Sequence, residues 1–423
     1  MPESPGADVR ATSPVSGILI AVLALLTAVA PLATDMYLPA FPAMAGDLGA
    51  GAAEIQLTLT AFLVGLGLGQ LLIGPLSDAT GRRRPLLIGS IVCVLAGVGC
   101  AFAPSVEVLG LARFVQGLSG AAGVVLARAI ISDTARGTAA AKLLGVTLII
   151  SIVAPVVAPL AGGGIIASFG WRAVFSVLAV LSLIMFIGAF AFAAESLPES
   201  ARTRGGVKAT LDGAREALSN RNYLGYLLTF CFAFAALFAY ISASPFVMQE
   251  VLGLSAGTYA LLFGLNALLI VITSSIAAAL AGRVPYRRMV AAGLGLASVA
   301  TAVLLVAVLG GAPTVPVLVT FAFFQGSLGF VFSNATTLAL AETGKNAGTG
   351  SAFLGFLQFT LAAVISPLVG LGGEGTALPM AVAMLLSMVL AVLTFCFIPR
   401  RTSQQAAGPQ PASAPPREAP AAT

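Results

Sequence analysis

Long apolar runs occupy most of this chain, and short polar or glycine-rich stretches separate them. A membrane core roughly 30 Å thick requires about 20 apolar residues per helix, and twelve runs reach that length. Continuous runs favour helices, because a membrane β-barrel is built from short segments of alternating polarity. The predicted membrane-spanning helices are residues 15–45, 55–76, 85–103, 105–130, 143–168, 171–194, 222–248, 257–281, 288–311, 315–341, 347–372 and 375–398.

The composition agrees with this pattern. Hydrophobic residues make up 58% of the 423 residues, charged residues make up 9%, and the mean hydropathy is +1.02. A typical soluble domain carries about 25% charged residues. We therefore expect an all-α membrane protein. The first apolar run is too long for a signal peptide, so we expect it to remain in the protein as a span.

Basic residues gather on one side of the predicted membrane. That side carries GRRRP (81–85), Arg136, Lys142, the stretch from Arg202 to Arg221, GRVPYRR (282–288), Lys345, Arg400 and Arg401. The opposite loops contain a single basic residue, Arg172. The positive-inside rule therefore places both termini in the cytoplasm. These loops account for the net charge of +5, so no nucleic-acid partner is expected.

The sequence predicts two related halves. FVQGLSG (114–120) matches FFQGSLG (323–329) at an offset of 209, and APLAGGG (158–164) matches SPLVGLG (366–372) at an offset of 208. Chance similarity between glycine-rich apolar helices is the alternative explanation. We predict a first six-helix half (1–194), a cytoplasmic loop (195–221), a second six-helix half (222–399) and a disordered tail (400–423). Repeated halves around a central path are typical of secondary transporters.

Two charged residues lie well inside predicted spans, Asp35 in the first and Arg113 in the fourth. Each costs about 2.5 to 3.5 kcal/mol on insertion scales and therefore calls for a cavity or a partner. Both are expected roughly 10 to 16 Å below the outer surface, where they can be neighbours. At an offset of 209, the second half has Ser244 and Ala322 instead. We interpret Asp35 as a proton-coupling carboxylate with Arg113 beside it, although a structural ion pair that fixes helix register is an alternative.

Two further segments contain residues that favour turns or bends. In APVVAPLAGGG (154–164), Pro155 and Pro159 remove backbone donors and can bend the helix, while Gly162 to Gly164 permit either bending or close packing. In GPLSDATGRRRP (74–85), Gly81 allows a tight turn, and Asp78 is expected to accept hydrogen bonds from a helix N-terminus. An alternative interpretation is that the arginines of that loop serve only as topology markers.

These motifs together resemble the major facilitator superfamily, and in particular its 12-span drug:proton antiporters of the bicyclomycin and chloramphenicol resistance branch. The resemblance covers residues 15–399 and rests on TDMYLPAFP (34–42), GPLSDATGRRRP, RFVQGLSGAAG (113–123), APVVAPLAGGG, residues 242–268 and residues 347–359. The superfamily loop motif is matched at Gly74, Leu76, Asp78, Gly81, Arg82 and Arg83, whereas Ala79 departs from it. The implied gating residues are Gly74, Asp78, Gly81, Arg82, Arg83, Pro155, Pro159 and Gly163.

The resemblance implies a fold of two pseudo-symmetric halves in a bacterial cytoplasmic membrane. It also implies efflux of a lipophilic drug in exchange for protons, with Asp35 responding to both and Arg113 as its partner. The expected partners are the drug, protons and the lipid bilayer, the chain is expected to act as a monomer, and no cofactor or metal is expected. The candidate substrate-binding residues are Asp35, Tyr37, Tyr240, Asn266, Gln325, Asn334 and Gln358.

Other functions remain as alternatives. The first is a proton-coupled transporter of a specific metabolite, such as a sugar or amino acid derivative, on the same fold. A membrane enzyme is disfavoured, because the chain has no histidine and shows neither paired intramembrane carboxylates nor metal-ligand spacing. A pump with its own ATPase is disfavoured by the absence of a G-x-x-x-x-G-K-[ST] phosphate loop. Without histidine, proton transfer falls to carboxylates.

Overall fold

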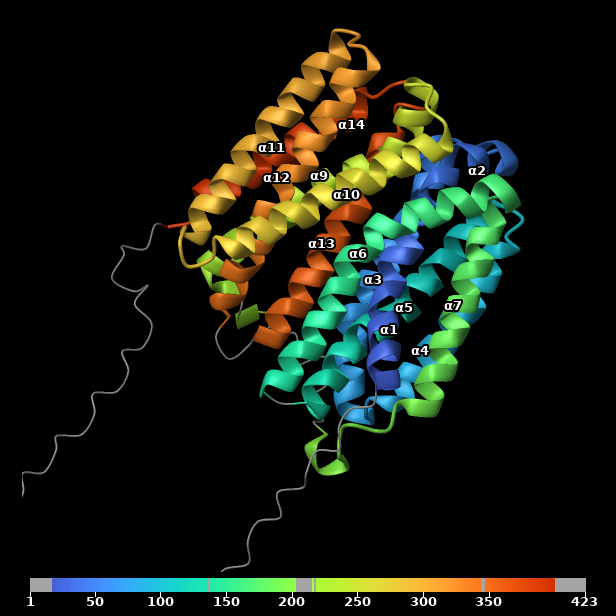
Figure 1. Cartoon of the computed structure of the whole chain (residues 1–423), viewed down its shortest axis with the longest axis vertical. Coiled ribbons are helices and arrows are strands. Elements are labelled where there is room, and N and C mark those ends of the chain that lie inside the picture. The colour runs from blue at the N-terminus through green and yellow to red at the C-terminus, as the bar shows by residue number, and fades with distance from the viewer. Residues whose placement is uncertain (1–16, 136, 203–214, 217, 344–346, 400–423) are drawn as a thin grey trace, which may run out of the picture.

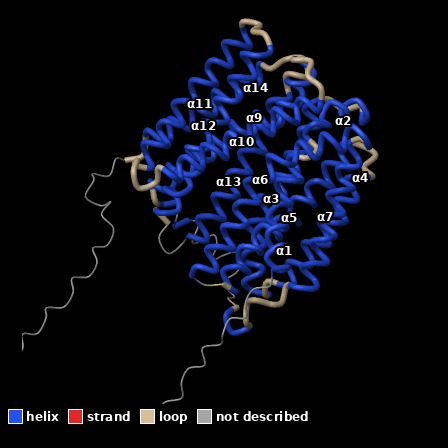
Figure 2. The backbone as a smooth tube through the Cα atoms, viewed as in Figure 1, coloured by secondary structure: helices blue, strands red, loops and turns tan. Residues whose placement is uncertain are grey.

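A computed structural model describes residues 17–135, 137–202, 215–216, 218–343 and 347–399. Its ordered elements are all helical, and no strand occurs in these residues (Figure 2). The elements are α1 (Gly17–Asp35), η1 (Leu38–Ala40), α2 (Phe41–Leu48), α3 (Ala52–Thr80), α4 (Arg83–Ala101), α5 (Val106–Thr134), α6 (Gly137–Phe169), α7 (Trp171–Phe192), η2 (Glu199–Ala201), α9 (Arg221–Phe246), η3 (Val247–Val251), α10 (Ala256–Ala279), α11 (Tyr286–Leu309), α12 (Thr314–Ala341), α13 (Ala347–Gly370) and α14 (Leu378–Cys396). Twelve helical segments of the described chain are long and apolar enough to span a membrane, which confirms the predicted fold class. The predicted disordered tail (400–423) and residues 203–214 and 217 of the predicted loop lie outside the described residues.

The helices form two groups that lie side by side (Figure 1). We call α1 to α7 the first half and α9 to α14 the second half. In the first half, α5 packs on α3 and α4, and α7 packs on α4 and α1. In the second half, α12 packs on α10 and α11, and α14 packs on α11 and α9. The same pairs of spans, counted from the start of each half, are therefore in contact, as expected for two copies of one six-helix unit.

The first span is broken where the sequence predicted one continuous helix. The α-helix α1 ends at Asp35, a turn follows, and the chain continues through η1 into α2. Proline explains the break, because Pro39 and Pro42 lack the N–H groups that an unbroken helix would need. The second half has a similar irregularity: after Pro245, α9 gives way to the π-helical turn η3.

The halves meet along two seams, α3 against α13 and α6 against α10. Using the predicted orientation, we call the end at which α3 begins the outer end. Near that end, the side-chain amide of Gln56 donates to the carbonyl oxygen of Ser242 at 3.1 Å. Gln249 donates to the carbonyl oxygen of Pro39 at 3.2 Å, and Thr60 donates to that of Ala363 at 3.2 Å. These contacts hold the outer ends of the halves together.

Candidate functional site

Asp35 lies at the last residue of α1, where the first span breaks, and its exposed fraction is only 5%. Among the described residues, no ion pair joins it to Arg113, so the predicted pairing is absent from this conformation. Asp35 is instead within electrostatic range of Tyr259 at the start of α10. The carboxyl group thus lies at the boundary between the two halves. A buried charge without a counter-ion costs free energy, so the stability of Asp35 in this position depends on whether its carboxyl group is protonated.

Arg113 is fully buried inside the first half. Its guanidinium carbon lies 4.2 Å from the centre of the Phe62 ring and 4.4 Å from that of the Tyr37 ring. Nη1 donates to the amide oxygen of Gln116 at 2.7 Å, whereas Nε and Nη2 have no hydrogen-bond partner among the described residues. The aromatic faces stabilise the cation. Three N–H groups, one on Nε and two on Nη2, nevertheless remain unused, so the arginine can donate to a further ligand or partner.

Glycines bring α3 and α5 close enough for the Phe62 ring to cover Arg113. We call the Phe62 and Tyr37 rings around this cation the aromatic enclosure. A Cβ atom on Gly117 would lie 2.0 Å from the carbonyl oxygen of Phe62, and one on Gly65 would lie 2.2 Å from that of Phe114. Such distances exclude any side chain unless the backbone moves. The close crossing therefore depends on glycine at both positions, and it places the Phe62 ring over Arg113.

A cluster of uncharged polar side chains occupies the corresponding region of the second half. Asn266 donates to the Tyr240 hydroxyl at 3.0 Å, and the hydroxyls of Ser244 and Tyr259 are 3.3 Å apart. The Tyr240 hydroxyl also interacts with Ser244 and Gln325. All five residues are buried. Since Tyr259 is within electrostatic range of Asp35, this second-half polar cluster extends from the boundary between the halves into α9, α10 and α12.

The remaining predicted substrate-binding residues take other places. Tyr37 is fully buried beneath Arg113, and its hydroxyl lies 3.4 Å from that of Thr58. Asn334 donates to the carbonyl oxygen of Phe330 at 2.7 Å, a bond within its own helix. Gln358 is partly buried on α13. The structure thus groups Tyr240, Asn266 and Gln325 but does not join Asn334 or Gln358 to them by hydrogen bonds.

Two adjoining hollows lie within the first half, between α1, α4, α5 and α7. The cavity volume of each is about 10 Å³, room for about one water molecule, and both are lined by Val29, Ser182 and Met185, while the second also reaches Gln116. Drug-sized ligands occupy pockets of about 300 to 1,000 Å³. Neither hollow matches the predicted substrate path between the halves.

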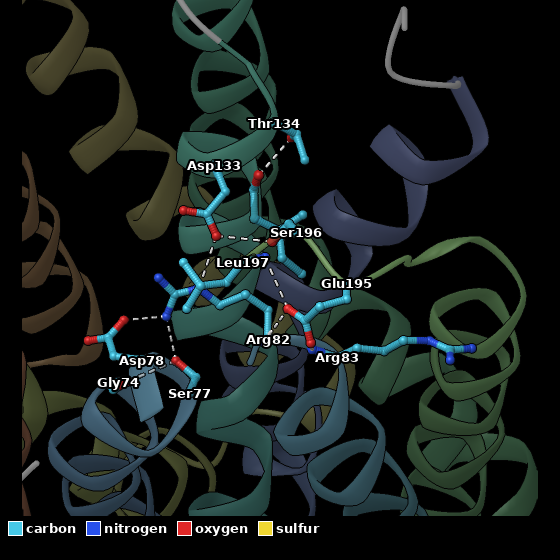
Figure 3. Close-up of polar contacts among 11 residues, drawn as sticks. Gly74, Ser77, Asp78, Arg82, Arg83, Asp133, Thr134, Glu195, Ser196 and Leu197 are labelled. Carbon is cyan, nitrogen blue, oxygen red and sulfur yellow. Dashed lines mark hydrogen bonds and ion pairs between the residues drawn. The ribbon is translucent and has the colours of Figure 1, made fainter. Parts of the chain in front are cut away.

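The predicted loop motif forms a charged cluster at the inner end of the first half (Figure 3). Arg82 forms ion pairs with Asp78 and Asp133, and its Nη1 also donates to Ser77 at 2.7 Å. Partial burial lowers the pKa of Arg82, but hydrogen bonds to the two carboxylates outweigh it and the pKa lies above its ordinary value. The residue therefore stays charged and ties the α3–α4 turn to the end of α5.

Glu195 occupies the place that the sequence assigned to Asp78. Its carboxylate accepts hydrogen bonds from the backbone N–H groups of Arg82 at 2.7 Å and Arg83 at 3.3 Å, at the start of α4. The expectation that Asp78 would bind a helix N-terminus is therefore wrong, because Asp78 is held by Arg82 instead. Gly81 makes room for Glu195: its φ is +93°, and a Cβ there would lie 2.3 Å from the carboxylate.

The prolines of the predicted gating segment do not interrupt α6, which runs unbroken from Gly137 to Phe169. The glycines that follow them permit close contact. A Cβ on Gly162 would lie 1.8 Å from the carbonyl oxygen of Met36, beside the break in the first span, and one on Gly163 would lie 2.9 Å from Cβ of Ala260 in the second half. Gly163 is thus part of the α6–α10 seam.

The sequence profile described as Major Facilitator Superfamily matches residues 23–367. The chain belongs to this superfamily. Its members are transporters rather than enzymes, and twelve apolar helices make this one a multi-pass membrane protein.

Several members of the superfamily resemble the chain along most of its length. An uncharacterized transporter named YdgK from Bacillus subtilis is 38% identical over 88% of this chain and 93% of its own length. A bicyclomycin resistance protein homolog from Haemophilus influenzae is 30% identical, covering 91% of this chain and 96% of its own. The multidrug resistance protein MdtL from Klebsiella pneumoniae is 27% identical, covering 88% and 94%.

Solved structures of the superfamily share the fold. The xylose transporter XylE of E. coli, in a partially occluded inward open conformation, superposes with a TM-score of 0.71 at 14% identity, covering 92% of this chain and 98% of its own. A bacterial homolog of the human lysosomal transporter Spinster, inward-facing and unoccupied, gives 0.70 at 16% identity, covering 92% and 95%.

Sequence reasoning about this superfamily member missed three charged residues. Asp133 and Glu195 lie in the inner cluster, and Arg128 is exposed on α5. The predicted span ended at 130, whereas α5 continues to Thr134 and places Arg128 about 9 Å inside the helix end. Arg128 could have been found from the sequence, because it is an arginine within an apolar stretch. Glu195 gave a weaker signal, as the first acidic residue after a span.

Proposed function

We propose that this transporter exports lipophilic antibiotics of the bicyclomycin or chloramphenicol kind across the bacterial cytoplasmic membrane in exchange for protons. The names of two relatives, a bicyclomycin resistance protein homolog and the multidrug resistance protein MdtL, support export of such compounds. The chain acts as a monomer with both termini in the cytoplasm. Its partners are the drug, protons and lipid.

The observation that carries the proposal is the position of Asp35. It is a buried carboxyl group at a break in the first span, beside the polar cluster of the second half and without an ion-pair partner among the described residues. An intramembrane carboxyl in a chain without histidine is the natural proton carrier. Because Asp35 lies where the halves meet, its environment changes whenever they move relative to each other.

Alternating access then requires only that the halves rock about the two seams. The outer contacts of Gln56, Thr60 and Gln249 open when the drug leaves, which exposes Asp35 to the outer side. Proton uptake there neutralises the carboxyl and favours return of the halves to the present arrangement. Release of the proton on the inner side accompanies binding of the next drug molecule.

The test compares Asp35→Asn with Asp47→Asn in everted membrane vesicles that are acidified inside. In the unmodified protein, added chloramphenicol enters the vesicles and drives proton release from the lumen. We expect Asp35→Asn to lower this drug-dependent release at least 10-fold, because asparagine carries no exchangeable carboxyl proton. Asp47 is an exposed carboxylate bonded to Trp171 and Arg172 at the outer end, so its substitution is the matched control. Unchanged proton release from Asp35→Asn vesicles would refute the assigned role.

A further inference from the structure

The amide oxygen of Gln325 is a buried hydrogen-bond acceptor without a donor. The side chain is 2% exposed, and Oε1 has no partner among the described residues. Buried polar atoms are nearly always paired in native proteins, and those that are not require an explanation. The amide lies beside the Tyr240 hydroxyl, which also accepts a hydrogen bond from Asn266. An unused acceptor therefore sits within the second-half polar cluster.

The internal repeat explains why the donor is missing. In the aligned segments FVQGLSG and FFQGSLG, Gln116 of the first half corresponds to Gln325 of the second. The oxygen of Gln116 is occupied by the guanidinium of Arg113 at 2.7 Å. The residue corresponding to Arg113 is Ala322, which has no donor to offer. The second half thus retains the acceptor while lacking the side chain that would occupy it.

The surroundings of Gln325 indicate the chemistry of a ligand. Tyr240 stacks on Phe263 with ring centres 5.8 Å apart and contacts Phe321 edge-on at 5.1 Å, so aromatic faces line the cluster. None of the five cluster residues is charged at neutral pH. An apolar wall with a few uncharged hydrogen-bonding groups suits a neutral compound rather than an organic cation.

We propose that Gln325 is a specificity-determining residue that accepts a hydrogen bond from a primary hydroxyl group on a neutral, otherwise apolar ligand. The inference rests on the proposed function and narrows its substrate class. The ligand takes, at Gln325, the place that Arg113 holds at Gln116. A compound of the same shape without the donor leaves the acceptor unpaired and binds more weakly.

A matched pair of compounds tests this inference. Thiamphenicol carries a primary hydroxyl where florfenicol carries fluorine, and the two share their remaining donors, a secondary hydroxyl and an amide N–H. Binding to the purified full-length protein in lipid nanodiscs is measured for both. We expect the unmodified protein to bind thiamphenicol about 10-fold more tightly, the usual worth of one well-placed hydrogen bond. In Gln325→Met, both compounds should bind with the affinity of florfenicol.

Two further variants make the test independent of one substitution. Ala322→Arg supplies the donor that the first half has, and it should abolish the preference for thiamphenicol in the same way. Asn222→Met removes an amide at the inner start of α9, away from the second-half polar cluster, and should keep the preference.

Three outcomes overturn the inference: the unmodified protein binds neither compound, it binds both equally, or Gln325→Met retains the preference. The proposed function fails separately. Drug-driven proton exchange without any dependence on Gln325 refutes only the specificity role. If the preference for thiamphenicol depends on Gln325 but added drug does not change the proton flux, only the antiport is refuted.

Discussion

The two halves differ most where they correspond most closely. At equivalent positions the first half has Asp35 and Arg113, whereas the second has Ser244 and Ala322. Both halves keep the glutamine of the repeated motif, Gln116 in one and Gln325 in the other. The same pairs of helices are in contact around these positions. The helix arrangement is therefore repeated, while at these buried positions only the first half is charged and uncharged hydrogen-bonding groups gather in the second.

In the proposed antiport, this asymmetry separates two tasks that an exchanger must combine. Proton binding needs an ionisable group, and a cation held in an aromatic enclosure can influence it. Recognition of neutral drugs needs hydrogen-bonding groups that do not attract ions. Placing the two on opposite sides of one boundary, with Asp35 near Tyr259, allows occupation of one to affect the other. Paired substitutions at equivalent positions test this difference between the halves.

The largest expected effect comes from the repeated glycines. A Cβ on Gly117 would lie 2.0 Å from the carbonyl oxygen of Phe62, whereas one on the equivalent Gly326 would meet nothing closer than 3.9 Å. We expect Gly117→Ala to lower the free energy of unfolding by about 3 kcal/mol, because two backbones must separate. Gly326→Ala should change it by less than about 0.5 kcal/mol. Thermal unfolding in detergent measures both, and equal losses would contradict the close α3–α5 crossing.

The next effect distinguishes the two glutamines. In Gln116→Met, Nη1 of the buried Arg113 loses its acceptor, so we expect a loss of about 2 kcal/mol in unfolding free energy. In Gln325→Met, a buried acceptor that lacks a donor is removed together with the amide's interaction with the Tyr240 hydroxyl, so we expect a clearly smaller loss than in Gln116→Met. The pair is compared by thermal unfolding without added drug. Equal losses in the two variants would contradict an unpaired Gln325 oxygen.

The fold was largely predictable, because long apolar runs leave the backbone no alternative to helices in a membrane. The break at Asp35 was not predicted, since Pro39 and Pro42 lie within a run that is otherwise apolar. Among the site residues, the partner of Arg113 was available in the sequence: Gln116 is three residues further along the same helix and therefore on the same face. The expected partner, Asp35, was chosen on charge and depth alone.

Other contacts had no signal that could be read from one sequence. Glu195 meets Arg82 across 113 residues of chain, and neither spacing nor composition indicates which carboxylate will reach the α4 N-terminus. The unpaired oxygen of Gln325 differs, because comparison of Arg113 with Ala322 at the repeat offset was sufficient to expose it. Comparison of internal repeats therefore reveals missing hydrogen-bond partners as well as a shared helix arrangement.

A smaller effect on stability is expected at the inner end of the first half. There, carboxylates bind the turn between α3 and α4, which corresponds to the turn between α10 and α11 in the second half. Partial burial raises the pKa of Glu195, but backbone N–H bonds from Arg82, Leu197 and Arg83 and the charge of Arg202 outweigh it and lower the pKa overall.

We expect Glu195→Gln to lose about 1 kcal/mol at pH 7, a typical value for an N-terminal cap. A lowered pKa stabilises the fold above the ordinary glutamate value of about 4.3, and this contribution disappears as the pH falls below it. The difference between variant and unmodified protein should therefore vanish in acid. A difference that persists at low pH would rule out the charged cap.

The smallest expected effect concerns a contact that the halves share. Arg83 donates to the carbonyl oxygens of Ala193 and Phe190 at the end of α7, at 3.0 and 3.1 Å. Arg287 donates in the same manner to Ile398 and Pro399 after α14, at 2.8 and 3.3 Å. Both are cations at helix C-termini on the surface, where such contacts contribute about 0.3 to 1 kcal/mol. Arg83→Gln and Arg287→Gln should therefore reduce stability by similar amounts within that range. If thermal unfolding shows a much larger loss for Arg83→Gln alone, the first-half arginine depends on the neighbouring carboxylates, and the asymmetry between the halves extends to their inner ends.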